Sequence, residues 1–235
     1  MKKILFLIIA FFTILIGHTQ AGRIHIEDGN KKYELKDFEG AMLDYTKAIE
    51  LDPNNSINYK YRGDMMFELK NFKEALADYT KAVELDPNYA FSYTNRGDTK
   101  FELQDYQSAI LDYTKAIAIN PNDKYNYFRR GVAKFKLEDH RGALLDYNKT
   151  IKLNPNYLAA YSWRAFAKHE LKDYQGAILD YTKAIASNPT EAVIYYNRGL
   201  AKIDSKQKES GCLDLSKAGE LGYPKSYKMI KKYCN

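Results

Sequence analysis

Few residues in this chain combine the types and the spacing that catalysis requires. Beyond residue 21 the histidines are His25, His140 and His169, and the cysteines are Cys212 and Cys234. No histidine has a cysteine or a recurring pair of carboxylates near it, and the cysteines fit neither a zinc pattern nor a Cys-x-x-Cys redox pair. The sequence has no glycine-rich phosphate loop and no Gly-x-Ser-x-Gly motif. We therefore expect no catalytic residue, metal, cofactor or small-molecule substrate, so the chain is not predicted to be an enzyme.

The first 21 residues resemble a secretory signal peptide. Lys2 and Lys3 precede an uncharged run over residues 4–17, and Thr19 and Ala21 are small residues at the positions that a signal peptidase reads. The run is shorter than the roughly 18 apolar residues of a membrane span. We expect cleavage after Ala21 and export to the periplasm or the medium; the alternative is an uncleaved segment that holds the protein at the membrane.

The charge of the chain is mild and evenly spread. Removal of residues 1–21 lowers the formal net charge from +6 to +4. Nucleic-acid binding usually needs a concentrated basic face, and no such block occurs. We expect no nucleic-acid partner.

A repeat of 34 residues organises the rest of the sequence. Proline, arginine, glycine, alanine and tyrosine recur at fixed places in it. Examples are the series Pro53, Pro87, Pro121, Pro155 and Pro189, the series Gly29, Gly63, Gly97, Gly131 and Gly199, and the series Tyr45, Tyr79, Tyr113, Tyr147 and Tyr181. The apolar residues from Phe72 to Leu85 fall on one helical face, and Tyr59 to Leu69 gives a helix before it. Each repeat is therefore predicted to be a pair of helices, with side-chain caps on the second helix from Asp37, Asn71, Asp105, Asp139 and Asp173.

This pattern resembles the tetratricopeptide repeat (TPR) family. The family's signature is met by Tyr59, Gly63, Ala75, Tyr79, Ala82 and Pro87 and their copies. The resemblance implies an all-α, right-handed solenoid of about six repeats over residues 22–55, 56–89, 90–123, 124–157, 158–191 and 192–225. Residues 226–235 would form a C-terminal capping helix. The sixth repeat departs from the pattern, with Gly211 and Leu215 where the others have alanine and tyrosine.

The resemblance also implies a binding surface, because in this family the first helices line a concave groove. Positions 2, 5, 6, 9, 12 and 13 of each repeat, which we call the groove positions, would face it. The ninth position changes from Asn30, Asp64 and Asp98 to Val132, Phe166 and Leu200, from polar to apolar. The candidate peptide-binding residues are Lys60, Asp64, Phe91, Asn95, Tyr125, Arg129, Val132, Trp163, Phe166 and Asn197. Packing is the alternative role for Trp163.

Some members of the family hold a peptide's C-terminal carboxylate in a clamp of lysine, asparagine and arginine. Lys60, Asn95 and Arg129 match three of the five clamp positions, whereas Asp64 and Tyr125 replace the other two. An acid in the clamp would repel a carboxylate. The sequence therefore favours a groove without a complete clamp.

Four periodic series are predicted to be structural. Arg62 and its copies recur together with Asp78 and its copies on the second helices, which indicates ion pairs between packed helices. The two tyrosine series are assigned to the core. Function would not require the same residue in every repeat.

A disulfide between Cys212 and Cys234 is predicted. Cys212 takes an apolar position of the sixth repeat, where the other repeats have Ile, Leu or Met, and Cys234 follows a short final helix. Export would expose both thiols to an oxidising compartment. The alternative is two free thiols.

These features predict a scaffold that binds a protein or a peptide in its groove. The alternative is a spacer or self-associating element of an envelope complex. The sequence does not choose between them.

The signal peptide can be tested directly. Because its basic and apolar regions have the order of a cleaved leader, we expect the exported protein to begin at Gly22. N-terminal sequencing of the exported protein measures this, and a chain in the membrane fraction that still begins at Met1 would show an anchored protein instead.

Overall fold

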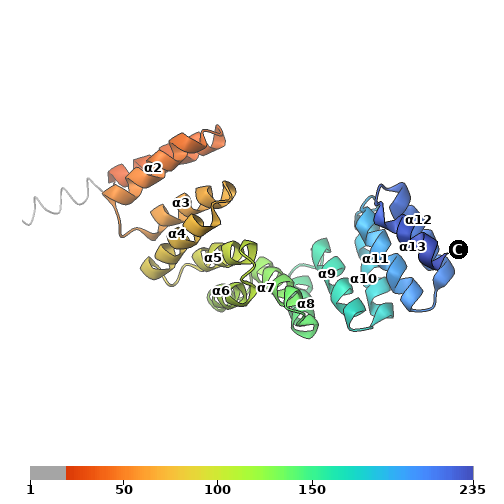
Figure 1. The fold of residues 1–235 in the computed structure, drawn as a ribbon. Helices are drawn as coiled ribbons and strands as arrows, with labels where there is room; N and C mark the ends of the chain where they lie inside the picture. Colours follow the sequence, from red (N-terminus) through yellow and green to blue (C-terminus); the bar gives the residue numbers. More distant parts are fainter. Residues whose placement is uncertain (1–19, 235) are drawn as a thin grey trace, which may run out of the picture. The chain divides into compact units, whose positions relative to one another are not determined.

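The computed structural model describes residues 20–234, and all regular structure in that range is helical (Figure 1). The predicted signal peptide, residues 1–21, falls almost wholly on residues 1–19, outside the described part. Residues 20–34 are helical, and Ala21 is among them. No helix between residues 20 and 234 is long and apolar enough to cross a bilayer.

Twelve further helices follow in the described residues. They are α2 Phe38–Leu51, α3 Ser56–Glu68, α4 Phe72–Leu85, α5 Ala90–Glu102, α6 Tyr106–Ile119, α7 Lys124–Lys136, α8 His140–Leu153, α9 Leu158–Glu170, α10 Tyr174–Ser187, α11 Ala192–Asp204, α12 Lys208–Glu220 and α13 Lys225–Tyr233. The prediction for α4 has the right bounds, whereas α3 begins three residues before the predicted Tyr59. The predicted all-α fold of paired helices with a C-terminal helix is confirmed.

The chain forms two compact units, Met1–Asn120 and Pro121–Asn235, which we call the N-terminal and C-terminal units. Within the N-terminal unit, α3 packs on α4 and α5 packs on α6; within the C-terminal unit the pairs are α7 with α8, α9 with α10 and α11 with α12. Successive first helices also touch, as α3 does α5 and α7 does α9. Side chains from neighbouring repeats can therefore meet on the first helices.

Each pair is joined by a tight turn in which the residue after the C-cap adopts a left-handed conformation. The residues in this conformation are Lys36, Lys70, Gln104, Glu138, Lys172 and Lys206, with φ between 61° and 68°. In one example the Asn71 N–H donates to the Met66 carbonyl at 2.8 Å and so closes the end of α3. Glycine usually occupies such a position, so these turns are held by the packing of the helices on either side.

Four of the five predicted caps form. Asp37, Asp105, Asp139 and Asp173 accept hydrogen bonds from the backbone N–H three residues later. The prediction was wrong for Asn71, whose side chain makes no cap hydrogen bond. The residue three positions after each of these aspartates is glycine or serine, whereas the residue three positions after Asn71 is Glu74. A methyl group at Gly40 would lie 2.2 Å from an Asp37 oxygen, so a larger residue there crowds the cap.

In the first four repeats, the core of each pair is built where a tyrosine ring lies against a glycine. In the fifth repeat Ala165 takes the place of the glycine and packs in one cluster with Tyr181, and in the sixth Leu215 lies against Gly199. A methyl group at Gly63 would lie 2.9 Å from the Tyr79 ring, and one at Gly131 would lie 2.7 Å from Tyr147. Ala75, Ala109 and Ala143 are fully buried on the facing helices. In the sixth repeat Gly211 replaces alanine, and a methyl group there would lie 2.7 Å from the Gly199 carbonyl oxygen. Small residues therefore set how closely the two helices approach.

The predicted arginine–aspartate pairs are all present. Each arginine, from Arg62 to Arg198, donates through Nε and Nη2 to both oxygens of its aspartate at 2.6–2.9 Å. A lysine one turn after most arginines adds a second cation, as Lys134 does on Asp146 at 2.8 Å. Sequence reasoning missed this lysine series. In the first repeat His25 and Lys32 pair with Asp44 instead.

One tyrosine series was wrongly assigned to the core. Tyr59 and its copies are only half-buried, and their rings lie beside the arginines, with the Arg164 guanidinium 5.3 Å from the Tyr161 ring centre. The Tyr59, Tyr127 and Tyr161 hydroxyls donate to the carbonyl of the proline six residues earlier. These rings cover the ion pairs because an arginine guanidinium stacks favourably on an aromatic face.

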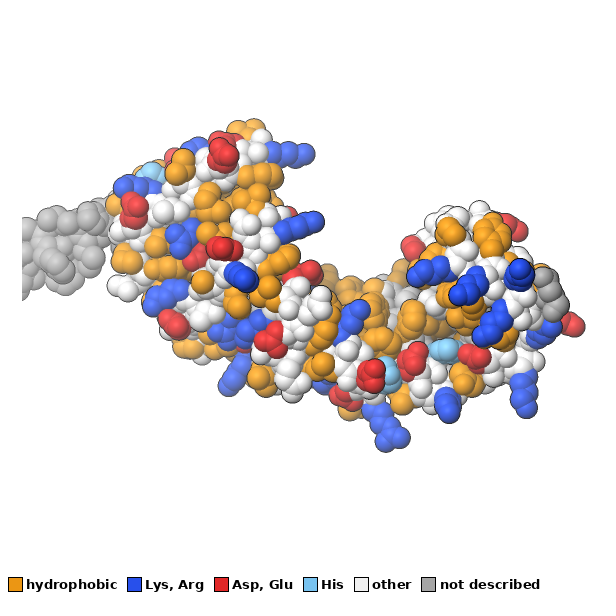
Figure 2. Space-filling model, in the orientation of Figure 1, with side chains coloured by type: hydrophobic (Ala, Val, Ile, Leu, Met, Phe, Trp, Pro, Cys, Tyr) orange, Lys and Arg blue, Asp and Glu red, His pale blue; other side chains and the backbone are white. Residues whose placement is uncertain are grey.

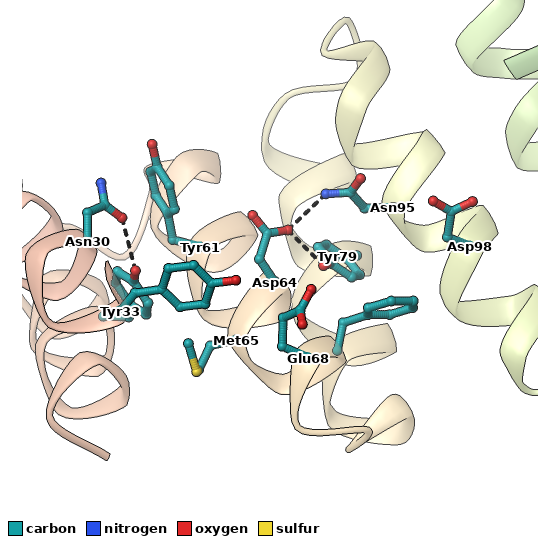
Figure 3. A pocket seen from close by; sticks show the side chains of 11 residues that line it. Asn30, Tyr33, Tyr61, Asp64, Met65, Glu68, Tyr79, Asn95 and Asp98 are labelled. Atoms are coloured by element: carbon teal, nitrogen blue, oxygen red, sulfur yellow. Dashed lines mark hydrogen bonds between the residues drawn. The ribbon is translucent and has the colours of Figure 1, made fainter. Parts of the chain in front are cut away.

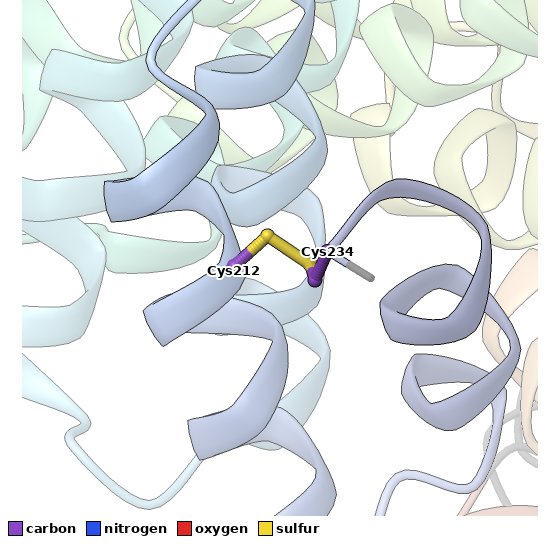
Figure 4. Close-up of a disulfide and its surroundings, with 2 residues drawn as sticks. All are labelled: Cys212 and Cys234. Carbon is purple, nitrogen blue, oxygen red and sulfur yellow. A yellow bond between two sulfur atoms is a disulfide. The ribbon is translucent and has the colours of Figure 1, made fainter.

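The predicted disulfide joins Cys212 on α12 to Cys234 at the end of α13 (Figure 4). The Cα atoms are 5.8 Å apart, and 22 positions separate the two residues. α13 also packs on α12 through Ser226, which is fully buried. A helix of nine residues is marginal alone, so this bond and this packing hold it.

Overpacking tests the helix contact at Ala109. Because Ala109 is fully buried, Ala109→Phe should force α5 and α6 apart and lower the free energy of unfolding by about 1–3 kcal/mol. Leu111→Phe is the matched control, because Leu111 lies on the same helix and is 63% exposed. Urea unfolding followed by circular dichroism measures both, and an unchanged midpoint for Ala109→Phe would contradict the assignment.

The disulfide should also stabilise the C-terminal unit. Closing a loop of this length contributes about 3 kcal/mol in the chain-entropy model, so the Cys212→Ser/Cys234→Ser double variant should lose about that much. Thiol titration of the denatured, unreduced protein is the direct measurement. We expect no free thiol, and two free thiols per chain would contradict the bond.

Candidate peptide-binding surface

The ninth position of the first three repeats is tied to the core tyrosines. The Tyr45 hydroxyl donates to Asn30 at 2.9 Å, Tyr79 to Asp64 at 2.7 Å, and Tyr113 to Asp98 at 2.8 Å. The polar residues of this series therefore have two roles: they occupy groove positions on the first helices, and they accept a hydrogen bond from the hydroxyl of a buried tyrosine. The sequence showed both series, and only the structure connects them.

A pocket of about 330 Å³ opens among these residues in the N-terminal unit (Figure 3). The helix of residues 20–34 contributes Asn30 and Tyr33, α3 contributes Asp64 and Glu68, and α5 contributes Asn95 and Asp98. The other lining residues are Tyr45, Tyr61, Met65, Phe67 and Tyr79. Asp64 and Glu68 are one helical turn apart, so both carboxylates lie on the same face of α3.

Asp64 is the centre of a hydrogen-bond network. Its Oδ1 accepts from the Tyr79 hydroxyl and from Asn95 Nδ2 at 2.9 Å (Figure 3). Its Oδ2 lies 2.7 Å from Lys60 Nζ. Lys60 and Asn95 are two of the three residues that match the carboxylate clamp. Both direct their donors at Asp64, so in the N-terminal unit the aspartate takes the place of a bound carboxylate.

Two tyrosines of the pocket, Tyr45 and Tyr79, stay protonated. Burial, with the charges of Tyr61 and Asp64, raises the pKa of Tyr45 to about 12. Burial and the Asp64 carboxylate also raise the pKa of Tyr79 far above its usual value. These hydroxyls therefore act as hydrogen-bond donors to the groove residues at any physiological pH.

The C-terminal unit replaces this polar network with aromatic packing. Phe135 contacts Trp163 and Phe166 edge-on, with ring centres 5.6 and 6.1 Å apart, and Phe166 meets Tyr181 at 6.0 Å. Trp163 is half-buried against this cluster, so it combines the packing role with partial exposure. Val132 offers no acceptor, and the buried Tyr147 hydroxyl has no hydrogen-bond partner among the described residues.

The remaining candidates are dispersed. Phe91 and Tyr125 are 57% and 47% exposed, and Arg129 and Asn197 are half-buried. The pocket unites only Asp64 and Asn95 of the predicted set, with Lys60 at its edge. Phe67 and Glu68, which sequence reasoning did not single out, occupy groove positions 12 and 13, so the pattern could have identified them. Figure 2 shows acidic and basic side chains interspersed over much of the face in view, with several basic side chains gathered on the C-terminal unit.

Two tyrosine substitutions test the link between core and groove. Tyr79→Phe removes a hydrogen bond to a carboxylate and should lower the free energy of unfolding by about 1.5–3 kcal/mol. Tyr147→Phe is the matched control, because it removes a buried hydroxyl without a partner and should be neutral or stabilising. Equal losses in urea unfolding would contradict the assignment.

Comparison with known proteins places this arrangement in a family. Models described as TPR repeat or tetratricopeptide repeat match residues 32–55, 63–104, 90–123 and 128–192. No protein with a curated description matches the chain.

Several solved structures share the fold. The MamA protein is 27% identical, with a TM-score of 0.68, over 74% of this chain and 94% of that one. YrrB, described as a TPR protein with an unusual peptide-binding site, is 23% identical over 80% and 97%, with a TM-score of 0.71. Pseudomonas aeruginosa pilF is 18% identical over 92% and 99%, with a TM-score of 0.77. The chain is therefore a tetratricopeptide repeat protein.

Proposed function

We propose that this protein is an exported scaffold that binds a protein or peptide partner along the first helices of its repeats. The observation that carries the proposal is that the positions of the repeat that pack the helices differ from the positions that line the groove. Glycine, alanine and tyrosine pack the helix pairs, whereas the groove positions of α3 and α5 form an open pocket that packing does not fill. YrrB, which has the same fold, is described as having a peptide-binding site, so the fold is compatible with this function.

The proposed surface has two kinds of subsite. The N-terminal unit offers Asp64, Asn95 and the other pocket residues, which suit polar side chains of a partner. The C-terminal unit offers Val132, Trp163 and Phe166, half-buried apolar groups that suit apolar side chains. Aromatic residues give much contact area for little loss of side-chain entropy, which favours them as anchors.

Export is supported by the cysteine pair. A disulfide persists in an oxidising compartment and is rare in the bacterial cytosol. The Cys212–Cys234 bond therefore agrees with the proposed leader over residues 1–21, with the periplasm or the medium as destination.

Self-association is a second candidate function, and one observation favours it. In the C-terminal unit Leu145, Leu179 and Leu213 recur at the same repeat position on the second helices and are 71%, 71% and 72% exposed. We call these residues the leucine row. Exposed apolar groups at a regular spacing suit contact with a second copy of the chain.

One experiment separates the two functions. Peptides selected by display against residues 22–235 should bind at least tenfold more weakly to the Arg129→Ala/Trp163→Ala/Phe166→Ala variant, because it loses the C-terminal subsite. The matched control replaces the leucine row with alanine and should leave peptide affinity unchanged. Calorimetry measures affinity, and circular dichroism checks that each variant is folded.

The opposite pattern would favour self-association. If no peptide is selected, or if the groove variant binds unchanged, the proposed binding function is wrong. Sedimentation equilibrium should then show an oligomer that the leucine-row variant loses.

A further inference from the structure

The pocket of the N-terminal unit has the charge and the walls of a site for a cationic side chain. We propose that it receives an arginine or lysine of the partner, with arginine preferred. This inference rests on the proposed function, since it names the chemistry that one subsite recognises.

Carboxylates dominate the charge of the pocket. Asp64, Glu68 and Asp98 line it, and no lysine, arginine or histidine does. Lys60 offsets one of these charges from the edge, at 2.7 Å from Asp64. Glu68 forms no hydrogen bond or ion pair with any described residue. The charge of Glu68 is therefore not offset by any described residue, and it attracts a cation and repels a carboxylate.

The walls of the pocket are aromatic. Tyr61 stacks on Tyr45 with ring centres 5.7 Å apart, and Tyr33 and Phe67 line the same space. Aromatic faces attract ammonium and guanidinium groups, and more often guanidinium. The planar guanidinium also matches carboxylate geometry in two hydrogen bonds, which is the reason to prefer arginine.

Lys60 shows this chemistry within the chain. Its ammonium lies 2.7 Å from Asp64 and 4.4 Å from the centre of the Tyr61 ring, so two lining residues already hold a cation. A volume of about 330 Å³ is at the lower end for ligand pockets, which suits one long side chain.

Three short capped peptides test the proposal, N-acetylated and C-amidated Ala-Ala-Xaa-Ala-Ala with arginine, lysine or citrulline at Xaa. Citrulline is a neutral isostere of arginine. Titration of residues 22–235 followed by amide chemical shifts should show saturable changes on α3 and α5 with arginine, weaker ones with lysine, and none with citrulline. Salt should weaken the binding because the contact is between charges.

Three substitutions localise the effect. Glu68→Gln should weaken the arginine peptide about fivefold or more. Glu102→Gln is the matched control, because Glu102 has the same repeat position on α5 and does not line the pocket, and it should change nothing. Lys60→Gln should strengthen binding about twofold or more, because it removes a competing cation.

The outcomes are distinct. Equal binding of the citrulline peptide would overturn the proposal. Weaker arginine binding in Lys60→Gln would also overturn it, because removal of a competing cation should strengthen the binding of a cationic ligand to carboxylates. Display peptides that bind through the groove but ignore Glu68→Gln would also overturn it while leaving the proposed function intact. The arginine peptide could bind as described while display selects no peptide longer than these five residues. In that case the proposed function fails and the pocket assignment stands.

Discussion

The contact between a tyrosine ring and the glycine of the facing helix is the constraint on which the other features depend. A methyl group at Gly97 would lie 2.8 Å from the Tyr113 ring, closer than side-chain atoms normally approach. In the first three repeats the tyrosine is thereby buried between the two helices of its repeat, and its hydroxyl donates a hydrogen bond to a side chain of the first helix. The helix spacing and the position of this hydroxyl are set together.

The polarity of the first helices follows from where that hydroxyl emerges. In the N-terminal unit an asparagine or aspartate accepts a hydrogen bond from this hydroxyl, and the rest of the carboxylate faces the pocket. In the C-terminal unit Val132 and Phe166 stand in the same place, and the surroundings become aromatic. A buried hydroxyl without an acceptor is destabilising because it loses its hydrogen bonds to water. The Tyr147 hydroxyl in the C-terminal unit has this cost, whereas the Tyr45, Tyr79 and Tyr113 hydroxyls in the N-terminal unit do not.

Charges elsewhere in the repeat are largely neutralised inside the fold. Each buried aspartate from Asp112 to Asp214 is held by an arginine and by a lysine one turn later, under a half-buried tyrosine ring. Cations used in this way do not contribute to a basic face. Glu68 on α3 has no ion pair or hydrogen bond with a described residue, so it stands out as a charge without a structural task.

The sequence by itself determined the features that repeat. Helix pairing, the small residue opposite each tyrosine, the arginine–aspartate pairs and the cysteine bond could all be read from it, because each depends on a spacing along the chain that recurs or on two unique residues. The candidate site could be read only in part. Lys60, Asp64 and Asn95 were identified separately, and only the tertiary structure decided that they bind one another, that Trp163 is half-buried, and that Tyr147 has no acceptor. Lys60 and Asp64 lie one turn apart on α3, whereas Asn95 lies on α5, 31 residues from Asp64 in sequence. Which of several nearby groups an aspartate or a hydroxyl pairs with depends on distances of a few ångströms, and the spacing along the sequence does not specify them.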